Sequence, residues 1–391
     1  MIQRTLRVLV GGSMLAGLTV GAGCGDADEA AEATSGGTTT NTSDGATTTT
    51  GASMGAGGDG AGAAGTGTGM GGGATTGTGS GAGGATPALL GCHDPRPANA
   101  PMPPALPTYG GTCPTLQPGL NQITSDGNAR EFRLVVPQSI AAGESLPVVF
   151  LWHWLGGDAT DFIEQGEVQE AADAYRFIAV VPEKKGDVQF TWPMDALSNS
   201  SRRAEEATFF DDMLACVAAQ YDVNADCVSS AGVSAGALFT SSVLAGERGQ
   251  HLSSIVSLSG GTGGLAIQPW SSPAHKMPAI VLWGGPTDSC LNLLSFETLS
   301  QDLETGLAND GHFFLECVHN CGHAEPPFDA PPGEARFAMM WQFIMDHPYW
   351  LADGDSPYLS EGLPAVMPAW CGIGAGSATP RTGQCLEPGG C

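Results

Sequence analysis

The sequence predicts an α/β protein with a doubly wound, mostly parallel sheet, preceded by a disordered tether. Three observations lead to this prediction. Short apolar runs rich in β-branched residues alternate with stretches of helical spacing over residues 130–347. Several of these runs end in glycine or proline, which commonly terminate strands. Residues 24–90, by contrast, are almost entirely Gly, Thr, Ala and Ser and lack the large apolar side chains that a packed core needs.

The first 90 residues are expected to lie outside the folded domain. Residues 1–23 have a charged start, a short apolar run and a zone of small residues, which is the pattern of a signal peptide. Cys24 follows directly and resembles the lipidated cysteine of a bacterial lipoprotein, although Gly21 stands where a leucine is usual. We therefore expect an exported protein, either a cell-envelope lipoprotein whose only membrane contact is a lipid anchor at Cys24 or a secreted protein with an incidental cysteine.

Seven segments of the domain expected at residues 91–391 have the pattern of strands. Continuous apolar runs with β-branched residues are typical of strands buried on both faces of a parallel sheet. The clearest is LPVVFLW (146–152), and RFIAVVP (176–182) has the same character with a proline at its end. In chain order the predicted strands are 130–137, 146–152, 176–182, 226–232, 252–261, 277–285 and 312–318.

Five segments between or after these strands have apolar residues three or four positions apart, which is the spacing of one helix face. In chain order the predicted helices are 158–175, 202–221, 234–247, 296–310 and 333–347. Alternating strands and helices place helices on both faces of a parallel sheet. Functional residues are then expected in the loops beyond the carboxyl ends of the strands.

The charge of the chain limits its partners. The formal net charge is −26, and no basic patch is present that would neutralise phosphates. Nucleic acid is therefore excluded as a partner, and polyanionic substrates are disfavoured by repulsion. We expect a monomer that acts without a cofactor.

The cysteines indicate disulfides. Eleven are present, and setting Cys24 aside leaves an even number, which in an exported chain predicts five bridges. A bridge between Cys216 and Cys227 is favoured because it closes a short loop after a helix. A metal site is not expected, because the chain has no C-x-x-C pair and only one suitable histidine pair, His319 and His323, near its cysteines.

Two further connections are expected from proximity along the chain. Cys290 is predicted to pair with Cys317 or Cys321. The C-terminal tail, 371–391, has no apolar pattern and is expected to be held by disulfides, with Cys92 or Cys113 as partners.

Three reactive residue types follow three predicted strands. Ser234 lies in GVSAG (232–236), which matches the G-x-S-x-G pattern of a nucleophile turned out between a strand and a helix. Asp288 follows the strand at 277–285, and His323 follows the strand at 312–318. The order Ser, Asp, His is that of α/β-hydrolases. A second match, GASMG at Ser53, lies in the tether and has no strand before it.

Competing residues are less well placed. His323 is preferred to His319 because a glycine directly precedes it and gives the loop freedom to present the ring. His312 falls inside a predicted strand, while Asp302 and Asp310 fall in or at the end of a predicted helix.

This set of residues predicts acyl transfer. His323 would take the proton of Ser234, and Asp288 would fix the tautomer of the imidazole. The loop HWLGG (153–157) follows a strand, so the N–H group of Trp154 or Leu155, together with that of Ala235, would hold the oxyanion. Water would then hydrolyse the acyl-enzyme.

Four blocks of the sequence resemble a known family. They are LPVVFLWHWLGG, QYDVNADCVSSAGVSAGAL, MPAIVLWGGPTD and NCGHAEPP. They are similar to the oxyanion, nucleophile, acid and histidine turns of the secreted polyhydroxybutyrate depolymerase and feruloyl esterase-like family of α/β-hydrolases. The resemblance covers about residues 130–347. It implies the same three residues as the triad and an esterase that acts on polymer-borne esters.

Departures from that family affect the substrate more than the triad. Trp154 replaces the family's glycine after the oxyanion-loop histidine. Trp154 and Trp192 are candidate substrate contacts, since indole rings stack on sugars or phenolic rings. Two other functions stay open: a catalytically silent binding lipoprotein in which Trp154 blocks the oxyanion site, and a serine peptidase.

Overall fold

The computed structural model describes residues 91–291 and 293–385, all of which belong to one compact unit, Ser80–Cys391. The predicted signal peptide, the tether and Cys24 lie outside the described residues. No helix in the described part of the chain is long and apolar enough to cross a membrane.

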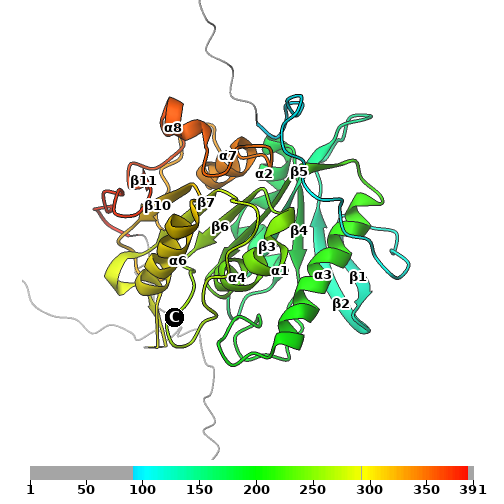
Figure 1. Cartoon of the computed structure of the whole chain (residues 1–391), viewed down its shortest axis with the longest axis horizontal. Coiled ribbons are helices and arrows are strands. Elements are labelled where there is room, and N and C mark those ends of the chain that lie inside the picture. The colour runs from blue at the N-terminus through cyan, green and yellow to red at the C-terminus, as the bar shows by residue number, and fades with distance from the viewer. Residues whose placement is uncertain (1–90, 292, 386–391) are drawn as a thin grey trace, which may run out of the picture. The chain divides into compact units, whose positions relative to one another are not determined.

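A nine-stranded sheet forms the centre of this unit (Figure 1), with the order β1-β2-β4-β3-β5-β6-β7-β10-β11. The strands β3, β4, β5, β6, β7 and β10 pair in parallel, and β1, β2 and β11 add antiparallel edges. The strands are β1 Gly119–Ser125, β2 Asn128–Val135, β3 Leu146–Trp152, β4 Ile178–Pro182, β5 Val223–Val233, β6 Ser254–Leu258, β7 Ala279–Trp283, β10 Phe314–Val318 and β11 Cys371–Ile373. A small hairpin, β8 Ser289–Cys290 and β9 Leu294–Ser295, stands apart from this sheet.

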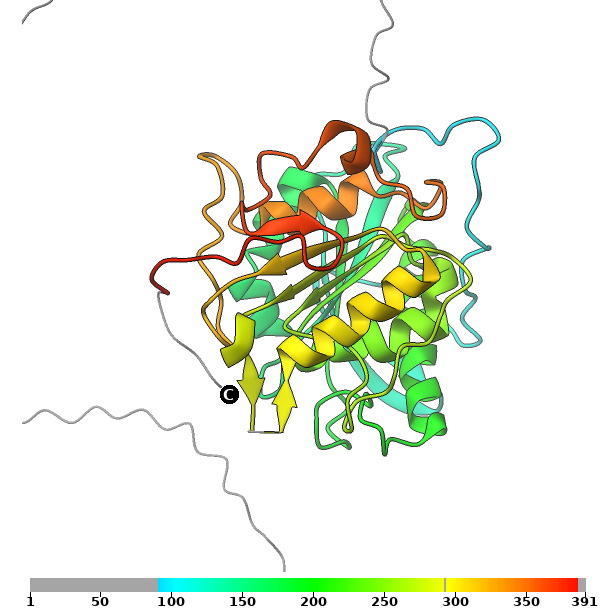
Figure 2. The ribbon, with the colours of Figure 1, turned by 60° about the vertical axis from the view of Figure 1, so that its left-hand side comes forward.

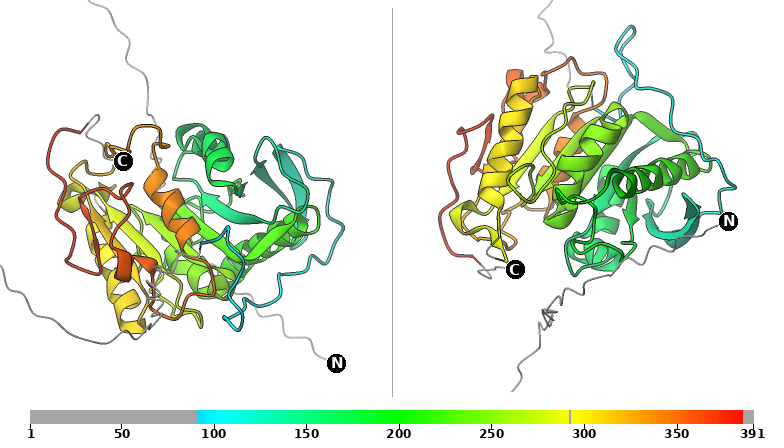
Figure 3. Two further views of the ribbon diagram at one scale, coloured as in Figure 1. Left: turned by 90° about the horizontal axis from the view of Figure 1, so that it is seen from above. Right: turned by 60° about the horizontal axis from the view of Figure 1, so that its bottom comes forward.

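Helices cover both faces of the sheet (Figure 3), as the sequence predicts. The helices are α1 Ala159–Gln165, α2 Val168–Tyr175, α3 Ser200–Ala218, α4 Ala235–Phe239, α5 Ala245–Arg248, α6 Phe296–Asp310, α7 Ala338–Asp346 and α8 Pro357–Glu361. Successive side chains of β3 enter opposite cores, because strand side chains alternate between faces. Phe150 packs in the core beneath α3, α4 and α6, while Val149 and Leu151 pack beneath α1, α2 and α7. The predicted fold class is confirmed.

The element bounds differ from the predictions where local backbone geometry intervenes. The helix predicted over 158–175 is two helices, because Gly166 caps α1 and Glu167 adopts a left-handed conformation with φ 49°. The helix predicted over 234–247 is interrupted by a π-helical turn, Thr240–Leu244. The strands β1 and β11 and the helix α8 were not predicted from the sequence.

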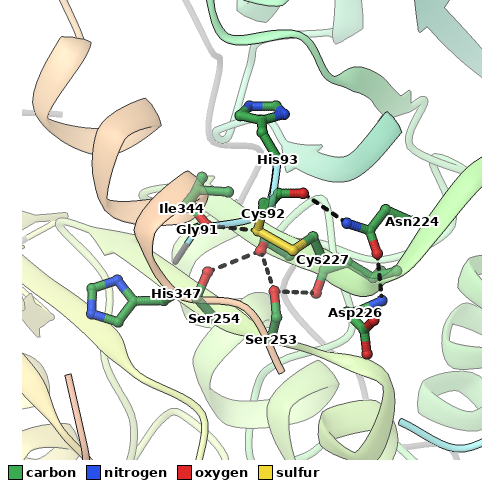
Figure 4. Close-up of a disulfide and its surroundings, with 12 residues drawn as sticks. Gly91, Cys92, His93, Asn224, Asp226, Cys227, Ser253, Ser254, Ile344 and His347 are labelled. Atoms are coloured by element: carbon green, nitrogen blue, oxygen red, sulfur yellow. Dashed lines mark hydrogen bonds between the residues drawn. A yellow bond between two sulfur atoms is a disulfide. The ribbon is translucent and has the colours of Figure 1, made fainter. Parts of the chain in front are cut away.

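The disulfides bind the two ends of the described chain to the sheet. Cys92 pairs with Cys227, and Cys113 pairs with Cys216, so the segment before β1 is tied to β5 and α3. Figure 4 shows the first bridge beside a hydrogen bond from the Asn224 side chain to the Cys92 carbonyl, 2.8 Å long. At the other end, Cys317 pairs with Cys371 and Cys321 with Cys385.

Three disulfide predictions are therefore wrong. Cys216 and Cys227 do not pair, because Cys216 points from α3 into the core on one face of the sheet and Cys227 lies in the core on the opposite face. Cys290 is disulfide-bonded, but Cys317 and Cys321 are both paired elsewhere. The described part of the C-terminal tail is bridged to β10 and the turn after it, and not to Cys92 or Cys113.

A buried carboxyl group lies under this tail. Glu304 on α6 is only 2% exposed, and its Oε1 atom has no hydrogen-bond partner. Burial, reinforced by the nearby Glu316 carboxylate, raises the pKa of Glu304 to about 8. Glu316 itself accepts hydrogen bonds from the N–H groups of Gly376 and Ala378 at 3.0 and 2.7 Å.

Replacement of Glu304 by glutamine is expected to change how stability depends on pH. The folded-state pKa, about 8, lies above the unfolded value of about 4.3, so this group's contribution is full below pH ~4.3 and is lost as pH rises toward 8. Between these two pH values, the free energy of unfolding of the wild type should fall by up to about 1.4 kcal/mol per pH unit relative to that of the variant. Thermal unfolding at pH 5 and pH 9 measures this, with Glu361→Gln on the exposed side of α8 as the control. Equal pH slopes for the wild type and Glu304→Gln would contradict the assignment.

Candidate active site

Ser234 occupies a strained turn between β5 and α4. Its φ of 54° and ψ of −118° are unusual for a residue with a side chain, and its N–H donates to the Leu258 carbonyl at 2.9 Å. A Cβ atom on Gly236 would lie 1.9 Å from the Trp152 carbonyl oxygen, and one on Gly232 would lie 2.3 Å from the Gly236 carbonyl carbon. Both glycines are therefore required for α4 to begin directly against the ends of β3 and β5, which presents the Ser234 hydroxyl at the sheet edge.

His323 is brought to Ser234 by the turn after β10. Its Nε2 lies 2.9 Å from Ser234 Oγ, although the two residues are 89 positions apart. The ring stacks on Phe296 with 4.3 Å between centroids and 14° between planes. The preceding Gly322 has φ 65°, and its carbonyl oxygen would lie 1.9 Å from a Cβ atom on Gly284. This close approach locks the turn against the end of β7.

Asp288 is the acidic partner. It is 1% exposed, and its Oδ1 lies 2.7 Å from His323 Nδ1. Its Oδ2 accepts hydrogen bonds from the Gly284 N–H and the Ser259 hydroxyl, both at 2.8 Å. With the Nδ1 proton directed to the carboxylate, Nε2 is left free to accept a proton from Ser234.

Ser259 was not identified from the sequence. It follows β6, has φ 48° and is buried. The only sequence signal is its place in SLSGG (257–261), after a predicted strand and before two glycines. Its hydroxyl holds the second oxygen of Asp288 and thereby fixes the carboxylate plane toward His323.

On the ester hydrolysis that the sequence predicts, replacement of Ser259 by alanine is expected to lower kcat/KM for a p-nitrophenyl ester roughly tenfold, the effect of one hydrogen bond to a charged group. Ser259→Gly is the matched control, because glycine also lacks the hydroxyl but adopts a positive φ without strain. Steady-state kinetics should give similar losses for both variants. A wild-type rate for Ser259→Gly would show that the backbone conformation matters and the hydroxyl does not.

The loop after β3 lines the same cavity as Ser234 and has N–H groups without a protein acceptor. Within the described residues, the N–H groups of Trp154, Leu155 and Ala235 donate to no other protein group. The Trp154 carbonyl of the same loop accepts a hydrogen bond from His153 Nδ1 at 3.0 Å. Burial lowers the pKa of His153 to about 4, so the ring is neutral at pH 7.

Trp192 does not contact the cavity, and the prediction that it binds substrate is wrong. Its side chain is fully buried against Trp152 and Phe239. Its indole N–H donates to the His153 carbonyl at 2.8 Å. The ring therefore supports the loop after β3 from beneath.

A cavity of about 380 Å³ opens beside Ser234 and His323. It lies between α1 and the segment 324–340, and its walls are mainly apolar. The Trp154 indole forms part of this wall, where it packs on Phe162 at 6.0 Å between ring centroids and covers Gly157. The apolar lining comprises Trp154, Leu155, Phe162, Val233, Leu258, Leu282, Ala324, Pro326, Phe328, Phe337 and Met340.

The competing residues are engaged elsewhere. His319 is buried in the cavity wall, where its Nδ1 accepts the Cys321 N–H at 3.2 Å and burial lowers its pKa to about 4. His312 Nδ1 lies 2.9 Å from the Met277 carbonyl, at the amino end of the strands. Asp310 accepts a hydrogen bond from the Trp270 indole, and Asp302 accepts one from the Gly264 N–H.

Comparison with known proteins bears on the fold. No protein-family model matches the sequence, and no curated protein matches it. Among solved structures, native sOPH superposes with a TM-score of 0.55 at 16% identity, covering 70% of this chain and 99% of that chain. Native pOPH gives 0.53 at 15% identity, covering 67% and 97%. A cysteine variant of pOPH in complex with dimethyl sulfoxide gives 0.54 at 15% identity, covering 68% and 98%. At these identities the likeness shows the fold, which is that of the α/β-hydrolases.

Proposed function

We propose that this chain is an exported serine esterase. The observation that carries the proposal is the continuous hydrogen-bonded series from Ser234 Oγ to His323 Nε2, 2.9 Å, and from His323 Nδ1 to Asp288 Oδ1, 2.7 Å. The strained turn at Ser234 supports it further, because such strain is typical of nucleophiles presented at a sheet edge.

In the proposed reaction Ser234 Oγ attacks the ester carbonyl carbon while its proton passes to His323 Nε2. The negative charge that develops on the carbonyl oxygen is stabilised by the N–H of Ala235 and that of Trp154 or Leu155. His323 returns the proton to the departing alcohol. Water, deprotonated by His323, then attacks the acyl-enzyme and releases the acid and the free Ser234 hydroxyl.

The cavity supports an apolar acyl group as substrate. Its walls are aromatic and aliphatic, and its volume of about 380 Å³ is within the range of small-molecule sites. Esters borne on polymers, either feruloyl or acetyl groups on polysaccharide or a polyhydroxyalkanoate, remain the proposed substrates. A screen across feruloyl, acetyl-xylan and hydroxybutyrate esters selects among them. Export is supported by the disulfides, and the anchor at Cys24 and the monomeric state remain part of the proposal.

The test is turnover of p-nitrophenyl acetate by the wild type and by Ser234→Ala. The proposal requires that the wild type releases p-nitrophenol and that Ser234→Ala does not. Equal rates would favour the catalytically silent binding protein. Turnover of p-nitroanilides at rates comparable with the esters would favour a peptidase.

A further inference from the structure

Exposed leucines are concentrated at the edge of the sheet that carries the candidate active site. The described residues include ten exposed large apolar side chains, and half of them are leucines in loops that follow β3, β4, β6 or β7. We call these five residues the leucine rim: Leu155, Leu197, Leu265, Leu291 and Leu293.

Leu197 and Leu265 project from one ribbon. The loop before α3 and the loop after β6 pair through an antiparallel bridge between Asp195 and Ile267 and a hydrogen bond from the Ala196 N–H to the Ala266 carbonyl, 2.8 Å. Antiparallel pairing places residue 197 opposite residue 265. Their exposures of 95% and 102% show that neither side chain rests on the protein.

The backbone beneath these leucines is held in place. The Asp195 side chain accepts the Leu197 N–H at 3.0 Å and the Ser198 hydroxyl, and the Gln268 side chain donates to the Asp195 carbonyl at 2.7 Å. At the base of the ribbon, Ile267 is buried in the core. The two leucines are therefore presented on an ordered support.

The other members of the rim lie at the same edge. Leu155 lines the cavity, and Leu291 and Leu293 lie on the β8–β9 hairpin, which begins directly after Asp288. Figures 1 and 2 both show this hairpin, in yellow, and the green loop before α3 at the lower end of the molecule. An apolar surface that contacts the rim would therefore meet the edge at which an ester reaches Ser234.

We propose that the leucine rim docks the protein onto the surface of a water-insoluble, uncharged ester material, so that the scissile ester enters the cavity from that surface. This inference rests on the proposed esterase function. The net charge of −26 disfavours binding of the leucine rim to an anionic membrane or to a second copy of the chain. A neutral ester surface causes no such repulsion. Exposed apolar side chains gathered at a functional edge are typical of an interaction surface.

The experiment compares Leu197→Ser/Leu265→Ser with a control, Met102→Ser/Leu359→Ser, whose leucine and methionine are exposed on other segments. Adsorption to polycaprolactone particles is measured by depletion from solution, with every protein also carrying Ser234→Ala so that no particle is degraded. The rim variant should lose at least tenfold in affinity for the particles, and the control should bind like the parent. In the Ser234 background, both variants should turn over soluble p-nitrophenyl acetate at the wild-type rate.

Equal adsorption of the rim variant and the control would overturn the proposal. So would tighter binding of the parent to phosphatidylglycerol vesicles than to polycaprolactone, which would identify a membrane as the partner. Failure of the esterase proposal is separate, because it would appear as absent turnover of the soluble ester whatever the adsorption result.

Discussion

Replacement of Ser234 by alanine is expected to lower kcat/KM for p-nitrophenyl acetate by a factor of roughly 10⁴ to 10⁶, the largest effect that any single substitution in this chain should have. The reason is that alanine removes the only atom at this position that can form the acyl-enzyme. His323 Nε2, 2.9 Å from the hydroxyl, then has no proton to accept. The measurement is initial-rate kinetics at pH 7.5 on purified protein.

The same prediction includes a non-additive double variant. His323→Ala alone should reduce the rate by a similar factor, and Ser234→Ala/His323→Ala should lose little more, because the two residues act as one unit. Ser360→Ala, on the exposed side of α8, is the matched control and should leave the rate unchanged. Additive losses in the double variant would contradict a shared role.

Replacement of Glu206 by alanine is expected to cost about 3–5 kcal/mol of unfolding free energy. Glu206, on α3, is completely buried, with Oε1 2.5 Å from Arg130 Nη2 and Oε2 2.5 Å from Arg202 Nη1. Arg130 is itself buried, with its guanidinium 3.9 Å from the centre of the Phe209 ring. Removing the carboxylate would leave the Arg130 charge buried without a counter-ion.

The measurement is denaturant and thermal unfolding under oxidising conditions. The neighbouring Glu205→Ala is the matched control, since Glu205 is more exposed and pairs with Lys185 at 2.7 Å near the surface. A pair that keeps contact with solvent contributes less than a completely buried one, so Glu205→Ala should lower the melting temperature less than Glu206→Ala. Similar shifts for Glu205→Ala and Glu206→Ala would show that burial of the Arg130–Glu206 pair does not matter.

The sequence predicted the elements whose pattern is local. The helix predicted over 296–310 has the observed bounds, because Ser295 caps its start and Gly311 ends it with a left-handed backbone. The continuous apolar run of β3 likewise predicted a central buried strand. The structure agrees, since all seven residues of β3 are buried. Ser234, Asp288 and His323 could be proposed together because each lies within five residues of the end of a strand, and the carboxyl ends of parallel strands share one edge.

What the sequence could not predict depends on contacts between distant segments. Cys216 and Cys227 are neighbours along the chain, but they belong to cores on opposite faces of the sheet, so chain proximity misled the pairing. Ser259 acquires its contact with Asp288 only when β6 and β7 lie side by side. Trp192 has no sequence signal that distinguishes a substrate contact from the buried support that it forms beneath His153.

Covalent trapping of the nucleophile shows whether Ser234 is the residue that reacts with the ester. The protein is incubated with diethyl p-nitrophenyl phosphate, and the modified residue is identified by mass spectrometry of its peptides. If Ser234 is the nucleophile, the reaction releases one equivalent of p-nitrophenol, places a single diethylphosphoryl group on Ser234 and leaves Ser234→Ala unlabelled. A label on another residue, or ester turnover by a protein whose Ser234 stays unmodified, would contradict it.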